Sequence, residues 1–348
     1  MFSPLRLTQA VLALSLGSAF SLYAATHSVP LGQIADQQTR HIATYFPGRM
    51  AGSPAELMAA DYLHQRFNEM GYQSNLRAFN TRFIYTSKDG KQDWHNVSAT
   101  SVIAARNGSA PQQIIVVAHF DTYTPQSDTD VDHNLGGLTL QGVDDNASGV
   151  GVMLELAERM SRIPTRYSLR FVAMSAEEIG NKGSEDYVQR MSEEEKKNTL
   201  LVINLDSLVT GDKLYFNSGL HTPPQVAKKT RDRALDIARR YGIPAATNPG
   251  SNPSYPQGTG CCSDLVAFDN AHIPVLSIEA TNWTLGKKDG YQQRKISPRF
   301  PQGSSWHQSQ IDNMNYLDRA LPGRIVKRSR DVVKVVLPLI EELGANGA

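Results

Sequence analysis

The 348-residue sequence predicts a single α/β domain with a mixed, mostly parallel central sheet flanked by helices. Short, mostly apolar runs at 114–118, 169–173 and 200–205 have the length and composition of buried strands. Segments with helical spacing of apolar residues separate these runs, and this alternation is typical of a parallel sheet covered by helices. No internal repeat or low-complexity tract interrupts it, so one domain accounts for the pattern.

Two helices and a hairpin are expected before the first central strand. Residues 31–45 have helical spacing, and a second helix begins after Ser53, which we expect to be its N-cap. Pro54 at the first helical position and Glu56 at the capping-box position strengthen that prediction. Alternating, β-branched stretches over 73–105, divided by a turn signal, predict two antiparallel strands.

After strand 114–118 the chain continues as alternating strands and helices. A long polar loop over 123–142 comes first. We then expect, in order, helix 148–162, strand 169–175, helix 183–191, strand 200–206, strand 213–216, helix 224–241, helix 264–270 and strand 274–279. The segment 281–305 has little periodicity and is rich in Gly, Pro, Lys and aromatic residues. A loop of that length inside a compact domain is usually functional, so we expect a rim over a functional site.

The N-terminal segment has the pattern of a secretory signal. Arg6 precedes a mostly apolar stretch at 10–20, and small residues follow at Ala24 and Ala25. We therefore expect a signal peptide over 1–24, cleaved near 24/25, and a mature domain over 25–348 in the periplasm or outside the cell. A retained N-terminal anchor is the alternative, although the apolar run is short for a membrane span. After cleavage we expect no membrane association.

Composition excludes some partners. The formal charge is +1, with 35 basic and 34 acidic residues, so no global field favours nucleic acid as a partner. The local basic stretch at 324–330 is expected to be the solvated face of a C-terminal helix.

Cys261 and Cys262 are the only cysteines and are adjacent. Export favours a disulfide between them and geometry opposes it, so a vicinal disulfide and two unpaired thiols both stay open.

Five separated segments carry nitrogen and carboxylate side chains suited to metal binding, and three of them follow a predicted buried strand. In an open α/β sheet, ligands collect at the carboxyl ends of the strands, where these segments meet. A site for two divalent ions needs a bridging carboxylate, terminal ligands and a base that is not itself a ligand. The segments supply candidates for each role: His119-Phe-Asp121, Asp144–Gly149, Glu177-Glu178, Asp206 and His307.

Each candidate also has a local chemical reason. His119 ends a strand, and Asp121 can return to the other ring nitrogen and fix its tautomer. The turn at 144–146 holds more polar side chains than capping of the next helix requires. The side chains of Glu177 and Glu178 diverge, so one can bind metal while the other handles protons.

The last two ligand candidates differ in how well the sequence supports them. Asp206 ends a hydrophobic strand, where a carboxylate needs a partner. Spacing supports His307 least, and His272 is its rival, although His272 lies in a plain helix–strand turn.

These segments resemble those of the family-28 metallopeptidases, the co-catalytic zinc aminopeptidases of secreted bacterial type, over nearly all of the mature chain. The lead-in at 47–53 and the later stretches at 263–268 and 273–274 share the likeness. The resemblance implies two Zn²⁺ per chain and a cis peptide bond after the bridging aspartate. It also implies the roles: His119 and Asp206 on one ion, Glu178 and His307 on the other, Asp145 as bridge, Glu177 as general base, and Asp121 orienting His119.

The resemblance also implies a substrate, a peptide or protein with a free N-terminus. Likeness to one member narrows this to release of a basic residue, arginine especially, from alkaline phosphatase. Acidic residues in the rim, such as Asp289, are candidates for facing an arginine side chain. Two positions depart from the family pattern. Trp306 replaces a tyrosine before the last histidine, and the acidic residue expected four positions after His307 stands five after it, at Asp312.

Three other functions fit parts of the pattern. Related two-zinc carboxypeptidases and deacylases share the ligand order but resemble a pattern with Lys and Gly after the bridging Asp and an inserted dimerisation domain, which this chain lacks. A one-zinc glutaminyl cyclase or a catalytically dead binding protein would be expected to lose ligands or the base. All five ligand candidates and Glu177 are present, which favours a hydrolase. Mixed His and carboxylate ligands favour zinc, with manganese and cobalt left open.

Overall fold

The computed structural model describes residues 29–211, 213–250, 253–281, 283 and 306–345. The predicted signal peptide, and the predicted rim loop apart from Thr281 and Trp283, lie outside the described residues. One eight-stranded sheet forms the centre of the molecule, with strand order β1-β2-β4-β3-β5-β8-β6-β7. The predicted fold class is confirmed: the sheet is mixed, and four of its seven strand pairings are parallel.

The strands lie close to their predicted positions. Their bounds are β1 Gln73–Thr86, β2 Gln92–Arg106, β3 Gln113–His119, β4 Ser168–Met174, β5 Thr199–Asp206, β6 Lys213–Ser218, β7 Ala245–Ala246 and β8 Val275–Thr281. The predicted hairpin is formed by β1 and β2, which pair antiparallel along their whole length. The two-residue strand β7 was not predicted, because two alanines carry no strand signal of their own.

The main helices also follow the predictions. Their bounds are α2 Gln33–Tyr45, α3 Pro54–Glu69, α4 Asp128–Asp132, α5 Ser148–Met160, α6 Lys182–Arg190, α7 Glu193–Asn198, α8 Pro224–Ala227, α9 Arg233–Arg240, α10 Leu265–Asn270, α11 Met314–Ala320 and α12 Arg324–Ala345. A π-helical turn, η3 Lys228–Asp232, joins α8 to α9, so the predicted helix 224–241 is continuous. The short helices α4, α7 and α11 were not predicted.

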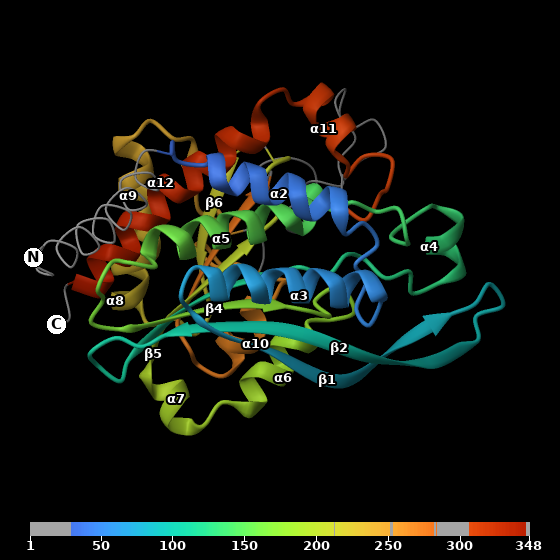
Figure 1. Ribbon diagram of the computed structural model, residues 1–348, viewed down its shortest axis with the longest axis horizontal. Helices are drawn as coiled ribbons and strands as arrows, with labels where there is room; N and C mark the ends of the chain where they lie inside the picture. Colours follow the sequence, from blue (N-terminus) through green and yellow to red (C-terminus); the bar gives the residue numbers. More distant parts are fainter. Residues whose placement is uncertain (1–28, 212, 251–252, 282, 284–305, 346–348) are drawn as a thin grey trace, which may run out of the picture.

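Helices cover the sheet on both faces, and each face has its own hydrophobic core. Figure 1 shows α2, α3, α5 and α12 on one side and α6, α7 and α10 on the other. Alternate residues of β3 enter the two cores, because successive side chains of a strand point to opposite faces. Ile114 and Val116 belong to the larger core with α5, whereas Ile115 and Val117 pack with α6 and α10.

Two local predictions are corrected in detail. Ser53 caps α3 by accepting a hydrogen bond from the Glu56 backbone N–H (3.1 Å). The Glu56 side chain, however, accepts from the N–H of Gly52 (3.1 Å) rather than from that of Ser53, because it is buried against β2 and also accepts from Thr100. The basic stretch of α12 is not simply a solvated face, since Arg328 is buried and donates to the Gly211 carbonyl (2.7 Å).

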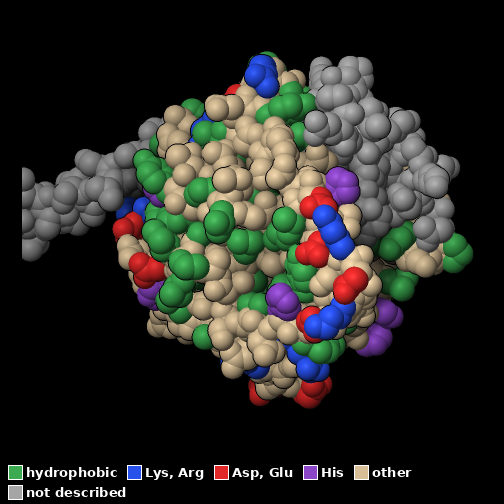
Figure 2. Space-filling model, turned by 90° about the vertical axis from the view of Figure 1, so that its right-hand side faces the viewer, with side chains coloured by type: hydrophobic (Ala, Val, Ile, Leu, Met, Phe, Trp, Pro, Cys, Tyr) green, Lys and Arg blue, Asp and Glu red, His purple; other side chains and the backbone are tan. Residues whose placement is uncertain are grey.

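The described surface agrees with the balanced composition. On the face shown in Figure 2, side chains of both charges lie next to one another, and hydrophobic side chains are scattered among them. No helix in the described ranges is long and apolar enough to cross a bilayer.

Candidate metal centre

The sheet topology brings the predicted site residues to one edge. β3 and β5 are parallel neighbours that end at His119 and Asp206, and β4, parallel to β3 on its other side, ends three residues before Glu177. The π-helical turn η2 Val143–Ala147 carries Asp145 and leads directly into α5, close to the ends of β3 and β5. Three strands and one helix entry therefore deliver side chains to a common point at the carboxyl ends of the strands.

Five of these side chains converge, and we call them the His–carboxylate cluster: His119, Asp145, Glu178, Asp206 and His307. The Nε2 atom of His119 lies 3.1 Å from Asp145 Oδ1 and 3.5 Å from Asp206 Oδ1. The Nε2 atom of His307 lies 3.0 Å from Glu178 Oε2 and 3.5 Å from Asp145 Oδ2. The two groups formed in this way have the spacing of metal ligands, and the rival His272 belongs to neither.

Asp145 is common to both groups. One of its oxygens faces His119 and the other faces His307, so a single carboxylate spans the two halves of the cluster. The peptide bond between Asp145 and Asn146 is cis. The side chain of Asn146 lies under the turn and donates to the carbonyls of Leu205 (2.9 Å) and His119 (3.2 Å). The turn carrying Asp145 is thereby tied to the ends of β3 and β5.

Glu177 lies at the edge of the cluster. Its Oε2 atom is 3.8 Å from His119 Nε2. Glu177 also forms, with His119 and Glu178, a group whose atoms have the spacing of metal ligands. Asp121 holds the backbone of both glutamates: its two carboxylate oxygens accept the backbone N–H groups of Glu177 and Glu178, each at 3.2 Å. Asp121 also faces Nδ1 of His119, through its backbone carbonyl at 3.2 Å and its Oδ1 at 3.5 Å. His119 therefore presents Nε2 to the cluster.

Asp312, the residue out of register with the family pattern, holds the turn that carries Asp145. Its two oxygens accept the backbone N–H groups of Asp144 (2.8 Å) and Asp145 (3.1 Å). Asp144 itself points away from the cluster and accepts from the Val209 N–H (2.8 Å). We call Asp121, Asp144 and Asp312 the support carboxylates, because each is fully buried and receives backbone N–H groups. The shift by one residue thus leaves an acidic side chain under the site.

A buried arginine connects two of the segments. Arg49 is fully buried and donates to the carbonyls of Phe120 (2.5 Å), Gln141 (2.6 Å) and Gly142 (2.8 Å). Burial lowers its pKa to about 10, and the nearby carboxylates oppose that shift. Arg49 thus places a positive charge behind the cluster while its N–H groups fix the loops that follow β3 and precede η2.

The cluster concentrates negative charge. Burial raises the pKa of Glu177 and of Glu178 well above the ordinary range, and repulsion from neighbouring carboxylates adds to this. Burial would also raise the pKa of Asp206, but hydrogen bonding and the charge of His119 outweigh it and lower that pKa. Glu178 Oε1 is buried and has no hydrogen-bond partner among the described residues. The protein groups alone leave this charge uncompensated.

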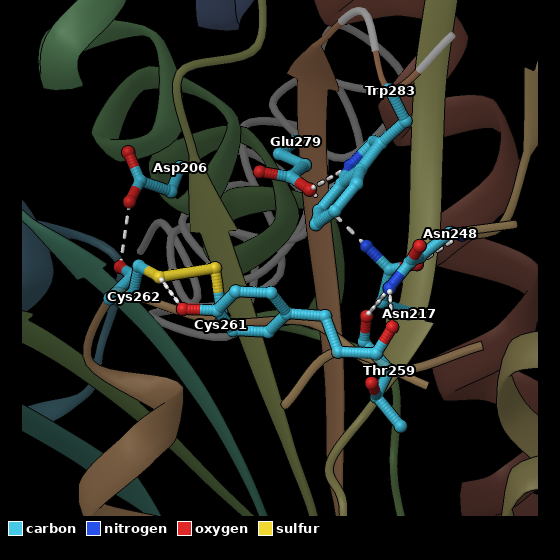
Figure 3. The surroundings of a disulfide bond; sticks show 10 residues. Asp206, Asn217, Asn248, Thr259, Cys261, Cys262, Glu279 and Trp283 are labelled. Atoms are coloured by element: carbon cyan, nitrogen blue, oxygen red, sulfur yellow. Dashed lines mark hydrogen bonds between the residues drawn. A yellow bond between two sulfur atoms is a disulfide. The ribbon is translucent and has the colours of Figure 1, made fainter. Parts of the chain in front are cut away.

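The cysteine pair lies next to the cluster. Of the two open interpretations, the structure contains the vicinal disulfide between Cys261 and Cys262. The following residue, Ser263, donates a hydrogen bond to Asp206 Oδ2 (2.6 Å), and the Tyr255 hydroxyl contacts Cys262 Sγ at 3.3 Å. Figure 3 shows the disulfide between Asp206 on one side and Asn217 and Trp283 on the other.

Sequence reasoning assigned no role to several residues that shape the site. Arg49, Ser263 and Glu279 are examples. A buried arginine is unusual without a partner, but its partners here are backbone carbonyls, which no sequence pattern reveals. Glu279 ends a predicted strand at the edge where ligands collect, and that position was an available signal.

Comparisons with known proteins identify the family of the chain. The model of the family described as Peptidase family M28 matches residues 101–333. The alkaline phosphatase isozyme conversion protein of Escherichia coli (strain K12) is 61% identical over 343 residues, which cover 99% of both chains. Aminopeptidase YwaD of Bacillus subtilis (strain 168) is 35% identical over 119 residues, 32% of this chain and 23% of that protein.

Solved structures share the fold at low identity. The zinc aminopeptidase BSAP from Bacillus subtilis superposes with a TM-score of 0.65 at 16% identity, covering 90% of this chain and 94% of that chain. A glutaminyl cyclase from Porphyromonas gingivalis superposes with a TM-score of 0.64 at 18% identity, covering 89% and 98%. These likenesses show the fold and do not by themselves separate the two activities. The family match and the relative that is similar over its full length show the family: the chain belongs to peptidase family M28 and is a zinc-dependent peptidase.

Proposed function

We propose that the protein is an exported aminopeptidase that hydrolyses the first peptide bond of peptides or proteins with the help of two zinc ions. The observation that carries the proposal is the placement of Asp145 between two His–carboxylate pairs, one oxygen toward each. A carboxylate in that position would serve as the bridging ligand that a two-metal hydrolytic site requires.

The chemistry of the cluster fits two divalent cations. Three carboxylates and two imidazole rings meet there, Glu177 lies beside them, and the fixed positive charge of Arg49 is tied to carbonyls behind. Nitrogen and oxygen donors of this kind suit zinc. His119 and Asp206 would hold one ion, Glu178 and His307 the other, with Asp145 shared. Bound there, the ions would polarise the scissile carbonyl and lower the pKa of the attacking water to about 7.

Glu177 is the group that moves protons in this proposal. Its carboxylate lies beside the cluster, and the hydrogen bond from its backbone to Asp121 fixes where the side chain starts. Burial raises its pKa, which suits a residue that first accepts a proton from water and then donates it to the leaving amine. Asp121 orients His119 and both glutamates and does not contact the substrate.

The names of relatives support the amino end as the site of attack. The Bacillus subtilis relative is an aminopeptidase, and the Escherichia coli relative is named for conversion of alkaline phosphatase isozymes. We extend to this chain the removal of N-terminal residues, basic ones and arginine in particular, from a protein such as alkaline phosphatase, in the periplasm or outside the cell.

The test is hydrolysis of Arg-, Lys- and Leu-p-nitroanilide alongside their N-acetylated forms, before chelation, after chelation, and after zinc is added back. We expect cleavage of the free-amine substrates only, loss on chelation, and recovery with zinc. Cleavage of the acetylated forms at the same rate would contradict an aminopeptidase. Absence of turnover with any free-amine substrate would favour the cyclase or carboxypeptidase alternatives.

A further inference from the structure

We infer that Glu279 is the specificity-determining residue that binds the cationic side chain of the substrate's first residue. The inference rests on the proposed aminopeptidase function and assigns the group that would select a basic residue. Asp289 in the predicted rim lies outside the described residues, whereas Glu279 lies in β8 at the site itself.

The sheet places Glu279 beside the cluster. β5 and β8 are parallel neighbours, and Asp206 and Glu279 are register partners at their carboxyl ends. Residues opposite one another in adjacent strands project from the same face of the sheet. In Figure 3 Glu279 accordingly lies between Asp206 and Trp283, above the cysteine pair. A substrate whose scissile bond is at the cluster therefore has Glu279 within reach of a long side chain.

The surrounding residues hold the Glu279 carboxylate in a fixed orientation. Its Oε1 atom accepts two neutral N–H donors, from Trp283 Nε1 (3.0 Å) and Asn217 Nδ2 (3.2 Å). Asn217 is buried, and its own oxygen accepts from the Asn248 backbone N–H (2.8 Å). Asn248 is anchored in turn by its side-chain amide, which donates to the Thr259 carbonyl (2.9 Å). Support of this kind is typical of a side chain positioned for recognition.

Within the described ranges, Glu279 has no cationic partner. Both of its hydrogen-bond donors are neutral, both bond the same oxygen, and no ion pair joins it to a Lys, Arg or His side chain of those ranges. The side chain is partly exposed, so a ligand can reach it.

The neighbouring aromatic rings favour a guanidinium or ammonium ligand. Trp283 packs against Tyr255 with ring centroids 6.3 Å apart, and Figure 3 shows Trp283 beside Glu279. Aromatic faces attract cations, and arginine in particular both stacks on rings and pairs with carboxylates. Trp283 is buried whereas Tyr255 is partly exposed, so the Tyr255 ring is the one of the two that a ligand can contact, and a carboxylate near such a ring fits arginine best and lysine next.

The test compares Arg- and Leu-p-nitroanilide in the wild type and in Glu279→Gln. Glutamine keeps the shape and an acceptor for Trp283 but removes the charge. We expect the ratio of kcat/KM for Arg over Leu to fall about 100-fold, as for a charge pair that loses one partner in a desolvated site. The matched control is Glu194→Gln, an exposed carboxylate in α7, which should leave the ratio unchanged.

Several outcomes would overturn the inference. An unchanged Arg/Leu ratio in Glu279→Gln would do so, and so would an equal loss with both substrates, which would mean that Glu279 binds the α-amine or supports Asp206. If Glu279→Gln does not fold, as judged by its thermal unfolding, Glu279→Asp replaces it. That variant keeps the charge on a shorter side chain, and we expect the ratio to fall about tenfold; an unchanged ratio again overturns the inference.

If the proposed function itself is wrong, the experiment gives a different result. In that case the wild type cleaves neither substrate, and calorimetric titration with free L-arginine and L-norleucine decides the inference instead. Arginine binding that weakens in Glu279→Gln, while norleucine binding weakens less, supports it. Equal effects on the two amino acids overturn it.

Discussion

Two sets of buried acidic residues meet at the carboxyl edge of this sheet, and different groups face their oxygens. The support carboxylates Asp121 and Asp312 each accept two backbone N–H groups. The acidic members of the His–carboxylate cluster instead face imidazole rings, and Asp206 also accepts from the hydroxyls of Ser207 and Ser263. The first set is satisfied by the protein itself, whereas the second set requires cations.

This difference separates residues that position the site from residues that are proposed to bind the metal ions. Satisfied carboxylates hold loops in place: Asp121 fixes the segment of Glu177 and Glu178, and Asp312 fixes the turn of Asp145. Removal of one cluster residue should therefore abolish metal binding at one position, while removal of a support residue should weaken the whole arrangement slightly. Three substitutions test this distinction.

The largest effect is expected for His307→Ala, which removes one terminal ligand of the pair completed by Glu178. We expect zinc content to fall from about two ions to about one per chain, and kcat/KM to fall about 10,000-fold, because a metal in such a site contributes several kcal/mol. Zinc is measured by elemental analysis of the purified protein and activity with Arg-p-nitroanilide. Retention of two tightly bound ions would show that His307 is not a ligand.

Glu177→Gln, in contrast, should lower activity without loss of a zinc ion. Glutamine cannot accept a proton, so we expect kcat to fall about 1,000-fold while both zinc ions stay bound. KM should change little, since the proposed role of Glu177 is in the chemical step. Loss of a zinc ion in this variant would move Glu177 from base to ligand and would make the cluster larger than proposed.

The smallest effect is expected for Asp312→Asn. The amide offers one acceptor where the carboxylate offers two, so one buried N–H of the Asp144–Asp145 segment loses its partner. We expect the free energy of unfolding to fall by about 1–3 kcal/mol and zinc affinity to fall by about 10–100-fold. Urea denaturation and competition with a chelator measure the two quantities.

The matched control for that variant is Asp318→Asn, in the nearby helix α11. Asp318 is half-exposed and pairs with Arg40 at 2.7 Å, so its loss should change stability by less than about 1 kcal/mol and leave zinc affinity unchanged. Equal effects of the two variants would remove the distinction between a support carboxylate and an ordinary surface acid.

The sequence predicted the elements around the site well, because buried parallel strands and long amphipathic helices leave strong patterns. β3, β5 and α5 were placed within one or two residues at each end. His119, Glu178 and Asp206 were predicted for the same reason, since strand ends in an α/β sheet share an edge. Asp145 and His307 were predicted instead from the polar turn at 144–146 and from the family resemblance. Short elements such as β7 and α7 depend on tertiary packing and carry little local signal.

Apart from the contact of Asp121 with His119, the supporting contacts could not be predicted. Arg49 and Asp312 act on backbone groups of distant segments, and such contacts depend on how loops approach one another rather than on residue type. The solvated face predicted for α12 failed in the same way, because Arg328 finds a backbone carbonyl partner at Gly211. The sequence therefore predicted the side chains that converge, but not these contacts to backbone groups around them.

The order of residues along the chain also determines at what point during synthesis all residues of the site are present. His307 and Asp312 follow all eight strands of the described sheet. A chain shortened before them would contain the whole sheet but only one of the two His–carboxylate pairs, and the turn of Asp145 would lack the acceptor of its N–H groups. We therefore expect a molecule synthesised only as far as β8 to be inactive, and the segment that carries His307 and Asp312 to be required for activity.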